Sequence, residues 1–212
     1  EVTISETSKL TSMGEYVFKA DTKLTKLYIP NDVTNMGANI FLDATNNVML
    51  SVAENSYAQA YAERYGIPYE TRPVPATIVA SGSCGESANW ELDSKGVLKI
   101  TGSGAMSDNN PNQTPWEPYK HQIKHVVIGK DITSIGRFNF YWCGKLESVS
   151  FEEGTQLDRI GWGAFGYSSL PAIVIPDSVT RIDAYAFYFC SNLVEVTISE
   201  TSKLTSMGEY VF

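Results

Sequence analysis

The stretch that decides the fold is residues 170–190, LPAIVIPDSVTRIDAYAFYFC. Its apolar spacing recurs on either side, in IKHVVIGKDITSIGRFNFYWCGK at 123–145, LESVSFEEGTQLDRIGWGAFGYSS at 146–169 and LVEVTISETSKLTSMGEYVF at 193–212. A fifth copy, LTKLYIPNDVTNMGANIFLDATN, occupies residues 24–46. A fixed period of about 23–25 residues indicates a repeat architecture.

Alignment of the copies places apolar residues in columns. Each L-x-x-V-x-I run has the spacing of a short strand, and the residue one repeat later falls on the same face of the next coil. One coil cannot bury its own apolar face, so a stack of coils in which neighbours cover one another is expected. The leading column comprises Ile123, Leu146, Leu170, Leu193 and Leu24, and a column that closes the opposite side comprises Phe140, Phe165, Phe187, Phe212 and Phe41.

A glycine column follows the second apolar run of the repeat. It comprises Gly136, Gly161, Gly208 and Gly37, and Asp183 takes the same place in the copy that begins at Leu170. Glycine adopts a positive φ at little steric cost, and Asp tolerates it better than most residues. We therefore predict a turn with positive φ at this column.

These residues carry a family resemblance. The pattern L-x-x-V-x-I-P-x-x-V-T-x-I-G-x-x-A-F-x-x-C resembles the BspA-like leucine-rich repeat of bacterial surface proteins. NNVMLSVAENSYAQAYAERYGIPYET at 46–71 looks like the terminal cap of such arrays, and residues 77–122 look like their leading module. The resemblance implies an α/β repeat solenoid, mostly β, with short parallel strands, one per 23–25-residue leucine-rich repeat, a β-hairpin leader module and a small helical cap.

The parts occur in an unusual order along the chain. Residues 1–71 hold the end of a leucine-rich repeat array plus a helical C-terminal cap (46–71), in which Ser56 is the expected N-cap and Gly66 the end of the helix. Residues 72–76 form a linker, residues 77–122 a β-rich leader module, and residues 123–212 four leucine-rich repeats lacking their cap. Residues 1–18 recur unchanged at 195–212. Two explanations are open, a natural tandem duplication and a deliberate cutting or joining of the chain.

Composition excludes two classes of partner. The chain has 24 acidic and 16 basic residues and a formal charge of −8, so it lacks the cationic field that a nucleic acid requires. No apolar run approaches the roughly 20 residues that cross a bilayer, so no membrane insertion is expected within this segment.

No set of residues indicates an enzyme, a cofactor or a metal site. A catalytic Ser or Cys needs a base held by a third group, and Cys84 has no recognisable partner His. A zinc site needs four close ligands, which three dispersed cysteines and two histidines do not supply. Cys143 and Cys190 share a column two repeats apart, too far for a disulfide, and are expected to be buried free thiols.

Two surfaces are candidates for partner contact. On the outward face of the sheet the side chains are mixed and mostly small, and the candidate contacts are His125, Val127, Ser148, Ser150, Glu195, Thr197, Lys26 and Tyr28. Further aromatic residues follow the Phe column and either form an exposed stripe for a partner or cover the back of the solenoid. They are Tyr141, Trp142, Tyr167, Tyr188 and Phe189.

The resemblance implies a non-enzymatic extracellular module, on the bacterial cell surface or secreted, that serves in recognition or adhesion. Its partner would be a host or bacterial surface protein or a glycan. The alternative is a structural spacer of tandem modules that projects another domain from the cell surface. We also expect head-to-tail self-association of copies through the edge at Glu1–Ile4 and the last coil near Phe212.

Overall fold

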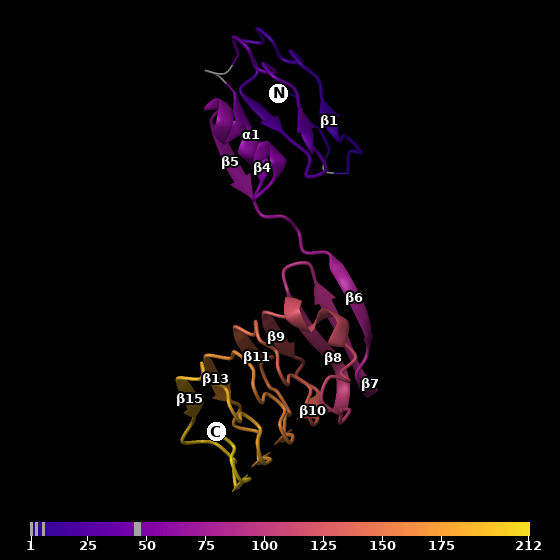
Figure 1. Ribbon diagram of the computed structural model, residues 1–212, viewed down its shortest axis with the longest axis vertical. Helices are drawn as coiled ribbons and strands as arrows, with labels where there is room; N and C mark the ends of the chain where they lie inside the picture. The colour runs from indigo at the N-terminus through magenta and orange to yellow at the C-terminus, as the bar shows by residue number, and fades with distance from the viewer. Residues whose placement is uncertain (1, 3, 6, 45–47) are drawn as a thin grey trace. The chain divides into compact units, whose positions relative to one another are not determined.

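The structure is a computed structural model, and it describes residues 2, 4–5, 7–44 and 48–212 (Figure 1). The chain divides into two compact units, Glu1–Pro75 and Ala76–Phe212. Each unit has its own hydrophobic core and consists mainly of short parallel strands. The mostly-β repeat solenoid predicted from the sequence is confirmed.

The first unit contains two small parallel sheets and one helix. Strands β2 (Lys26–Tyr28), β4 (Met49–Ala53) and β5 (Tyr69–Arg72) form one sheet, and β1 (Ser12–Met13) and β3 (Asn35–Met36) form the other. Helix α1 (Tyr57–Tyr65) begins where the Ser56 hydroxyl accepts the N–H of Gln59, and it ends at Gly66 with φ 64°. Both helix ends are as predicted, whereas positions 46 and 47 of the predicted cap lie outside the described residues.

The leader module is an antiparallel meander that continues into the repeats. Strands β6 (Ile78–Ser83), β7 (Gly85–Asp93) and β8 (Val97–Met106) pair in order, and Gly96, with φ 84°, lies in the hairpin turn between β7 and β8. The first half of β8 pairs with β9 and its second half with β10, so β8 supplies both sides of the first coil. A short 3-10 helix, η1 (Glu117–Gln122), leads into the first repeat.

Each repeat of the second unit contributes two strands, the first of four residues and the second of two to four. The first strands, which stack side by side in Figure 1, are β9 (His125–Ile128), β11 (Ser148–Phe151), β13 (Ala172–Ile175) and β15 (Glu195–Ile198). The second strands are β10 (Ile132–Ile135), β12 (Arg159–Ile160), β14 (Arg181–Ile182) and β16 (Ser206–Met207). The register pairs Ile160 with Ile182, so each column of the sequence becomes a row of neighbouring side chains.

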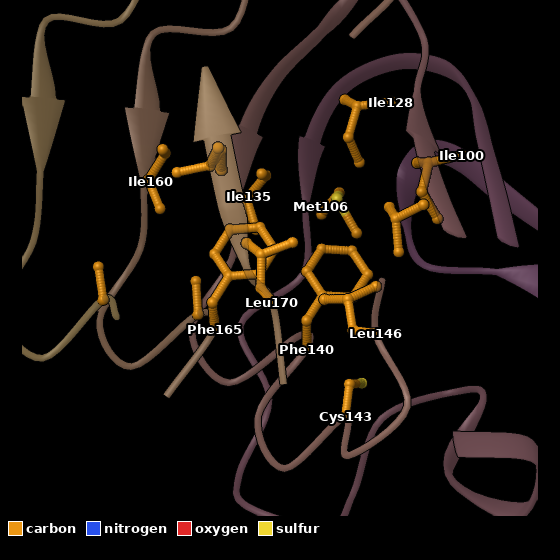
Figure 2. Close-up of a cluster of buried hydrophobic side chains, with 14 of the residues drawn as sticks. Ile100, Met106, Ile128, Ile135, Phe140, Cys143, Leu146, Ile160, Phe165 and Leu170 are labelled. Carbon is orange, nitrogen blue, oxygen red and sulfur yellow. The ribbon is translucent and has the colours of Figure 1, made fainter. Parts of the chain in front are cut away.

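The core follows the predicted columns. Leu146 and Leu170 are buried, and Leu193 is partly buried against the same cluster. Figure 2 shows Leu146 and Leu170 together with Phe140 and Phe165 directed into the interior. Ring centroids in the Phe column lie 5.1 Å apart from Phe140 to Phe165 and 5.2 Å apart from Phe165 to Phe187. The interior of the second unit is therefore one continuous stack.

The glycine column was predicted for the wrong reason. Gly136, Gly161, Gly208 and Gly37 do not have positive φ, and neither does Asp183. Instead, a Cβ atom at Gly161 would lie 2.7 Å from the Ile135 carbonyl oxygen of the previous coil, and the other three glycines face similarly close backbone atoms. The column allows neighbouring coils to approach one another. The Asp183 side chain is buried and holds two arginines.

Candidate partner-binding surfaces

The turn that closes each repeat forms a third side of the solenoid. Its backbone is fixed to the next coil, because the N–H of Phe140 donates to Ala164 O and that of Phe165 to Ala186 O, both at 2.7 Å. Positive φ occurs within this turn at two positions four residues apart, for example 56° at Phe138 and 58° at Trp142. A non-glycine residue with positive φ costs on the order of 1 kcal/mol or more and is retained only where its surroundings enforce it.

Aromatic residues occupy most of these strained positions in the second unit. They are Phe138, Trp142, Tyr167, Tyr185, Phe189 and Tyr210, and Gly163 is the exception in the repeats. In the first unit the corresponding positions of one turn hold Asn39 and Asp43. Asn and Asp enter this region several-fold more readily than aromatic residues, so the aromatic side chains are not there to satisfy the backbone.

The outer edge of the turns forms an exposed aromatic stripe. Tyr167 stacks between Trp142 and Phe189, with ring centroids 5.3 Å and 5.2 Å away. Trp142 is 57% and Phe189 60% exposed, whereas Tyr141, Tyr167 and Tyr188 are half-buried. The structure shows where these rings lie, and contact of the exposed ones with a partner stays a prediction. Two of the rings form a stripe, and the other three cover the back of the solenoid.

Behind the stripe, six aromatic rings form a closed circuit, which we name the aromatic circuit. Successive ring centroids are 5.0 Å apart from Phe138 to Tyr141, 5.5 Å from Tyr141 to Tyr167, 5.8 Å from Tyr167 to Tyr188, 5.2 Å from Tyr188 to Tyr185, 5.0 Å from Tyr185 to Trp162 and 4.8 Å from Trp162 to Phe138. These separations are all within the range of favourable aromatic pairs.

Two glycines open a hollow inside the aromatic circuit. The coils on either side carry aromatic residues in the columns that Gly163 and Gly166 occupy in the middle coil. The resulting hollow has a volume of about 350 Å³, and the rings of Tyr141, Trp162, Tyr167, Tyr185 and Tyr188 line it together with the two glycines. Sequence reasoning missed this site, and the missing aromatic residues in the middle repeat were the signal.

The hydroxyls of the hollow are available to a ligand. Those of Tyr141, Tyr167, Tyr185 and Tyr188 make no hydrogen bond to another part of the chain that the structure describes. Burial raises the pKa of Tyr167 above its usual value, and the neighbouring Tyr188 and Tyr141 hydroxyls add to this effect. The Tyr167 hydroxyl therefore keeps its proton at neutral pH and can donate a hydrogen bond.

A second hollow of about 480 Å³ adjoins the first and carries positive charge. Trp162 lines both, and the charged residues around the second are Arg137, Arg159, Arg181 and Asp183. The carboxylate of Asp183 pairs with Arg159 and Arg181, with Nε to oxygen distances of 2.7 Å and 2.5 Å. The Arg137 guanidinium lies 5.8 Å from the Trp162 ring, and no carboxylate of a described residue is within ion-pair distance of it.

Six of the sheet-face candidates lie on β9, β11 and β15 of the second unit. Ser148, Ser150, Glu195 and Thr197 are exposed, and His125 and Val127 are half-buried. His125 Nδ1 is 2.9 Å from the Ser148 hydroxyl on the next strand, and Nε2 is 3.7 Å from the Glu147 carboxylate. His125 therefore contacts Ser148 on the neighbouring coil.

Lys26 and Tyr28 belong to the other unit and are engaged within it. Lys26 forms a 2.7 Å ion pair with Glu70. The Arg72 guanidinium lies 3.7 Å from the centroid of the Tyr28 ring and also donates to the carbonyl oxygen of Ser51. Lys26 and Tyr28 therefore belong to a surface of the first unit, and the structure does not join them to the candidates of the second unit.

The three cysteines are free and buried. The prediction for Cys143 and Cys190 is confirmed. Burial raises the pKa of Cys84 and of Cys143 to about 12, which keeps both thiols protonated and unreactive. Among the described residues, no group of three or more His, Cys, Asp or Glu side chains is placed to hold a metal ion. No helix in the described part of the chain has the length and apolarity to span a membrane.

The stacked coils, the leader meander and the helical cap define a repeat protein of the parallel β-solenoid class. A family model described as BspA type leucine rich repeat region matches the chain in six copies over residues 1–61 and 119–212. The chain therefore belongs to the BspA-type leucine-rich repeat family. Repeat scaffolds of this kind are generally non-catalytic, and their extended surfaces bind other proteins.

Several solved structures are similar to the chain, whereas no curated protein matches it. A leucine-rich repeat protein from Eubacterium ventriosum is 25% identical, with 57% of this chain and 44% of that chain covered and a TM-score of 0.38. The pneumococcal vaccine antigen PcpA is 16% identical, with 64% and 41% covered and a TM-score of 0.42. A leucine rich cell surface protein from Faecalibacterium prausnitzii is 18% identical, with 94% and 51% covered and a TM-score of 0.34.

Proposed function

We propose that the chain is a non-enzymatic recognition or adhesion module of a bacterial surface protein, acting outside the cell on a protein or glycan partner. This proposal rests on the outward face of β9, β11, β13 and β15, where several side chains are exposed and take no part in the core. Ser148 and Ser150 on β11 are exposed, and Val174 on β13 is an apolar side chain that is 63% exposed. Mixed small polar and apolar side chains on an extended sheet are suited to contact with a folded partner.

The test is binding to immobilised extracellular-matrix proteins and glycans. Ser148→Arg combined with Ser150→Arg places two bulky charges at the centre of the sheet face, and loss of binding is expected. The matched control makes the same two changes at Ser81 and Ser87, exposed serines of the leader strands β6 and β7. Circular dichroism should show that both variants fold. Equal binding by the sheet-face variant and the control would move the partner site away from the sheet face.

A structural spacer is the second candidate. The division of the chain into two compact units at Pro75 and Ala76 favours it, because Pro73 and Pro75 make the connecting stretch stiff. A spacer would bind nothing in the same assay while keeping its fold. Binding to any matrix protein or glycan that the Ser148→Arg and Ser150→Arg changes abolish would rule it out as the sole function.

Self-association is a further kind of contact that we propose for the chain. The expected surfaces were the edge at Glu1–Ile4 and the coil near Phe212, of which positions 1 and 3 lie outside the described residues. Phe212 is 57% exposed, and its ring centroid lies 5.6 Å from that of Phe187, so we expect a ring of a second copy to stack on it. Sedimentation at rising concentration is expected to show association. A monomer throughout would contradict it.

A further inference from the structure

We propose that the hollow of the aromatic circuit binds one pyranose ring of an acidic glycan, a uronic or sialic acid unit whose carboxylate lies toward Arg137. The inference rests on the proposed recognition function but places the ligand on the turn side of the solenoid, away from the sheet face. It joins three observations, namely the glycine pair that opens the hollow, the free hydroxyls around it and the positive charge beside it.

The shape of the hollow fits a single sugar ring. Its volume of about 350 Å³ is near the lower end of the roughly 300–1,000 Å³ of small-molecule sites. Gly163 and Gly166 line it together with five aromatic side chains. A pyranose presents C–H groups on its faces and hydroxyls at its rim. Aromatic walls that carry phenol groups match both parts of such a ligand.

The conformational strain of the circuit supports a binding role. Phe138, Tyr167 and Tyr185 have φ of 56°, 57° and 61°, a conformation that aromatic residues seldom adopt. In the first unit one turn of this geometry is made with Asn39 and Asp43, which adopt it more readily, and another with Tyr16 and Ala20. The solenoid does not need aromatic residues at these positions. Strained residues that gather around one hollow are characteristic of a ligand site.

The charge beside the hollow decides between an acidic sugar and a cation. An aromatic enclosure could also hold a quaternary ammonium group. Here the Arg137 guanidinium already lies 5.8 Å from the ring centroids of Phe138 and Trp162. The adjoining hollow is lined by three guanidinium groups and one carboxylate, that of Asp183. A second cation would be repelled, whereas a carboxylate gains a charge-assisted hydrogen bond from Arg137.

The test compares matched saccharides on the full chain. Oligogalacturonate and sialyllactose are the acidic probes, galacto-oligosaccharide and lactose are their neutral counterparts, and choline is the cationic probe. Titration followed by NMR is expected to show binding of at least one acidic probe, weaker binding of its neutral counterpart and none of choline. Binding of choline in preference to the acids, or no binding of either acidic probe, would overturn the proposal.

Two variants assign the binding to the hollow. Gly166→Tyr introduces the residue that Tyr141 and Tyr188 provide in the same column of the adjacent coils, so it fills the hollow and removes no contact group. The new Cβ lies 3.1 Å from the Tyr141 ring, which must move slightly. We expect at least tenfold weaker binding of the acidic probe. Tyr57→Ala, which removes an exposed ring of helix α1, is the control and should bind normally.

Arg137→Gln separates the charge from the shape of the site. It should weaken the acidic probe roughly tenfold, the effect of losing one hydrogen bond to a charged group, and leave the neutral probe unchanged. If Gly166→Tyr does not fold, this exposed substitution still tests the proposal, because equal loss of both probes would refute the role of charge. If the unaltered chain binds a matrix protein through its sheet face but binds neither acidic probe, this inference alone is refuted. The proposed recognition function would remain.

Discussion

Replacement of Phe165 by alanine should test whether the stacked Phe column holds the second unit together. Phe165 is fully buried between Phe140 and Phe187, whose ring centroids lie 5.1 Å and 5.2 Å away. A buried Phe→Ala change costs about 3–5 kcal/mol, more where the site cannot collapse. Here backbone hydrogen bonds fix the neighbouring rings on both sides. We therefore expect the free energy of unfolding to fall by about 4 kcal/mol.

Tryptophan fluorescence in urea measures this change in one unit. All four tryptophans, Trp90, Trp116, Trp142 and Trp162, belong to Ala76–Phe212, so the signal reports the unfolding of that unit. The midpoint should shift while the dependence on urea concentration stays unchanged, as expected for a loss of stability alone.

Phe189→Ala is the matched control for this prediction. Phe189 also stacks on a neighbouring ring, but it is 60% exposed. Loss of its smaller buried area should cost below about 1 kcal/mol. If Phe165→Ala lowers the stability by less than about 1.5 kcal/mol, or by no more than the control does, the Phe column is not the principal core of the repeats.

Three further changes address the coil contacts, the thiols and the buried carboxylate. Gly136→Ala should destabilise by about 2 kcal/mol in urea titration, because its Cβ would collide with the Ser107 carbonyl oxygen, whereas Gly144→Ala has open space and should be neutral. Burial raises the pKa of Cys143 to about 12, so the folded chain keeps a thiol proton that the unfolded chain loses near pH ~8.5. The free energy of unfolding should therefore fall as the pH rises above ~8.5, and it should fall less steeply in Cys143→Ala. Asp183→Asn should lower the free energy of unfolding by about 1–2 kcal/mol. This loss is smaller than that expected for breaking a fully buried ion pair, because both arginines remain in contact with water.

The repeat core could be predicted from the sequence because each column is written several times. Five copies of the same apolar spacing leave one register for the strands, and Ile160 does pair with Ile182. Trp116 was harder to foresee, since it lies before the first repeat. It is fully buried and stacks on Phe140 at 5.6 Å, so it extends the Phe column into the leader. Only the three-dimensional structure shows that Trp116 lies in line with the Phe column.

The glycine column shows where reasoning from local conformation fails. Its residues recur because backbone atoms of the previous coil lie close to them, a property that depends on the distance between coils. A sequence indicates that glycine is required but does not distinguish positive φ from lack of space. The positive φ angles fall further along, at residues such as Phe138 and Trp142 that no propensity scale would select. The aromatic circuit was missed for the same reason.

Trp142→Asn would decide whether the exposed aromatic stripe serves the fold or a partner. The change loses the stacking contact with Tyr167, worth roughly 0.5–1.5 kcal/mol. It also removes the strain of an aromatic residue at φ 58°, since asparagine adopts this conformation more readily. The two effects are of similar size and opposite sign, so thermal unfolding followed by circular dichroism should show a change within about 0.5 kcal/mol. A loss above about 2 kcal/mol would make the stripe a structural cover. A neutral result would mean that the solenoid is equally stable without this indole, which leaves its exposed ring available for the partner contact that we predict.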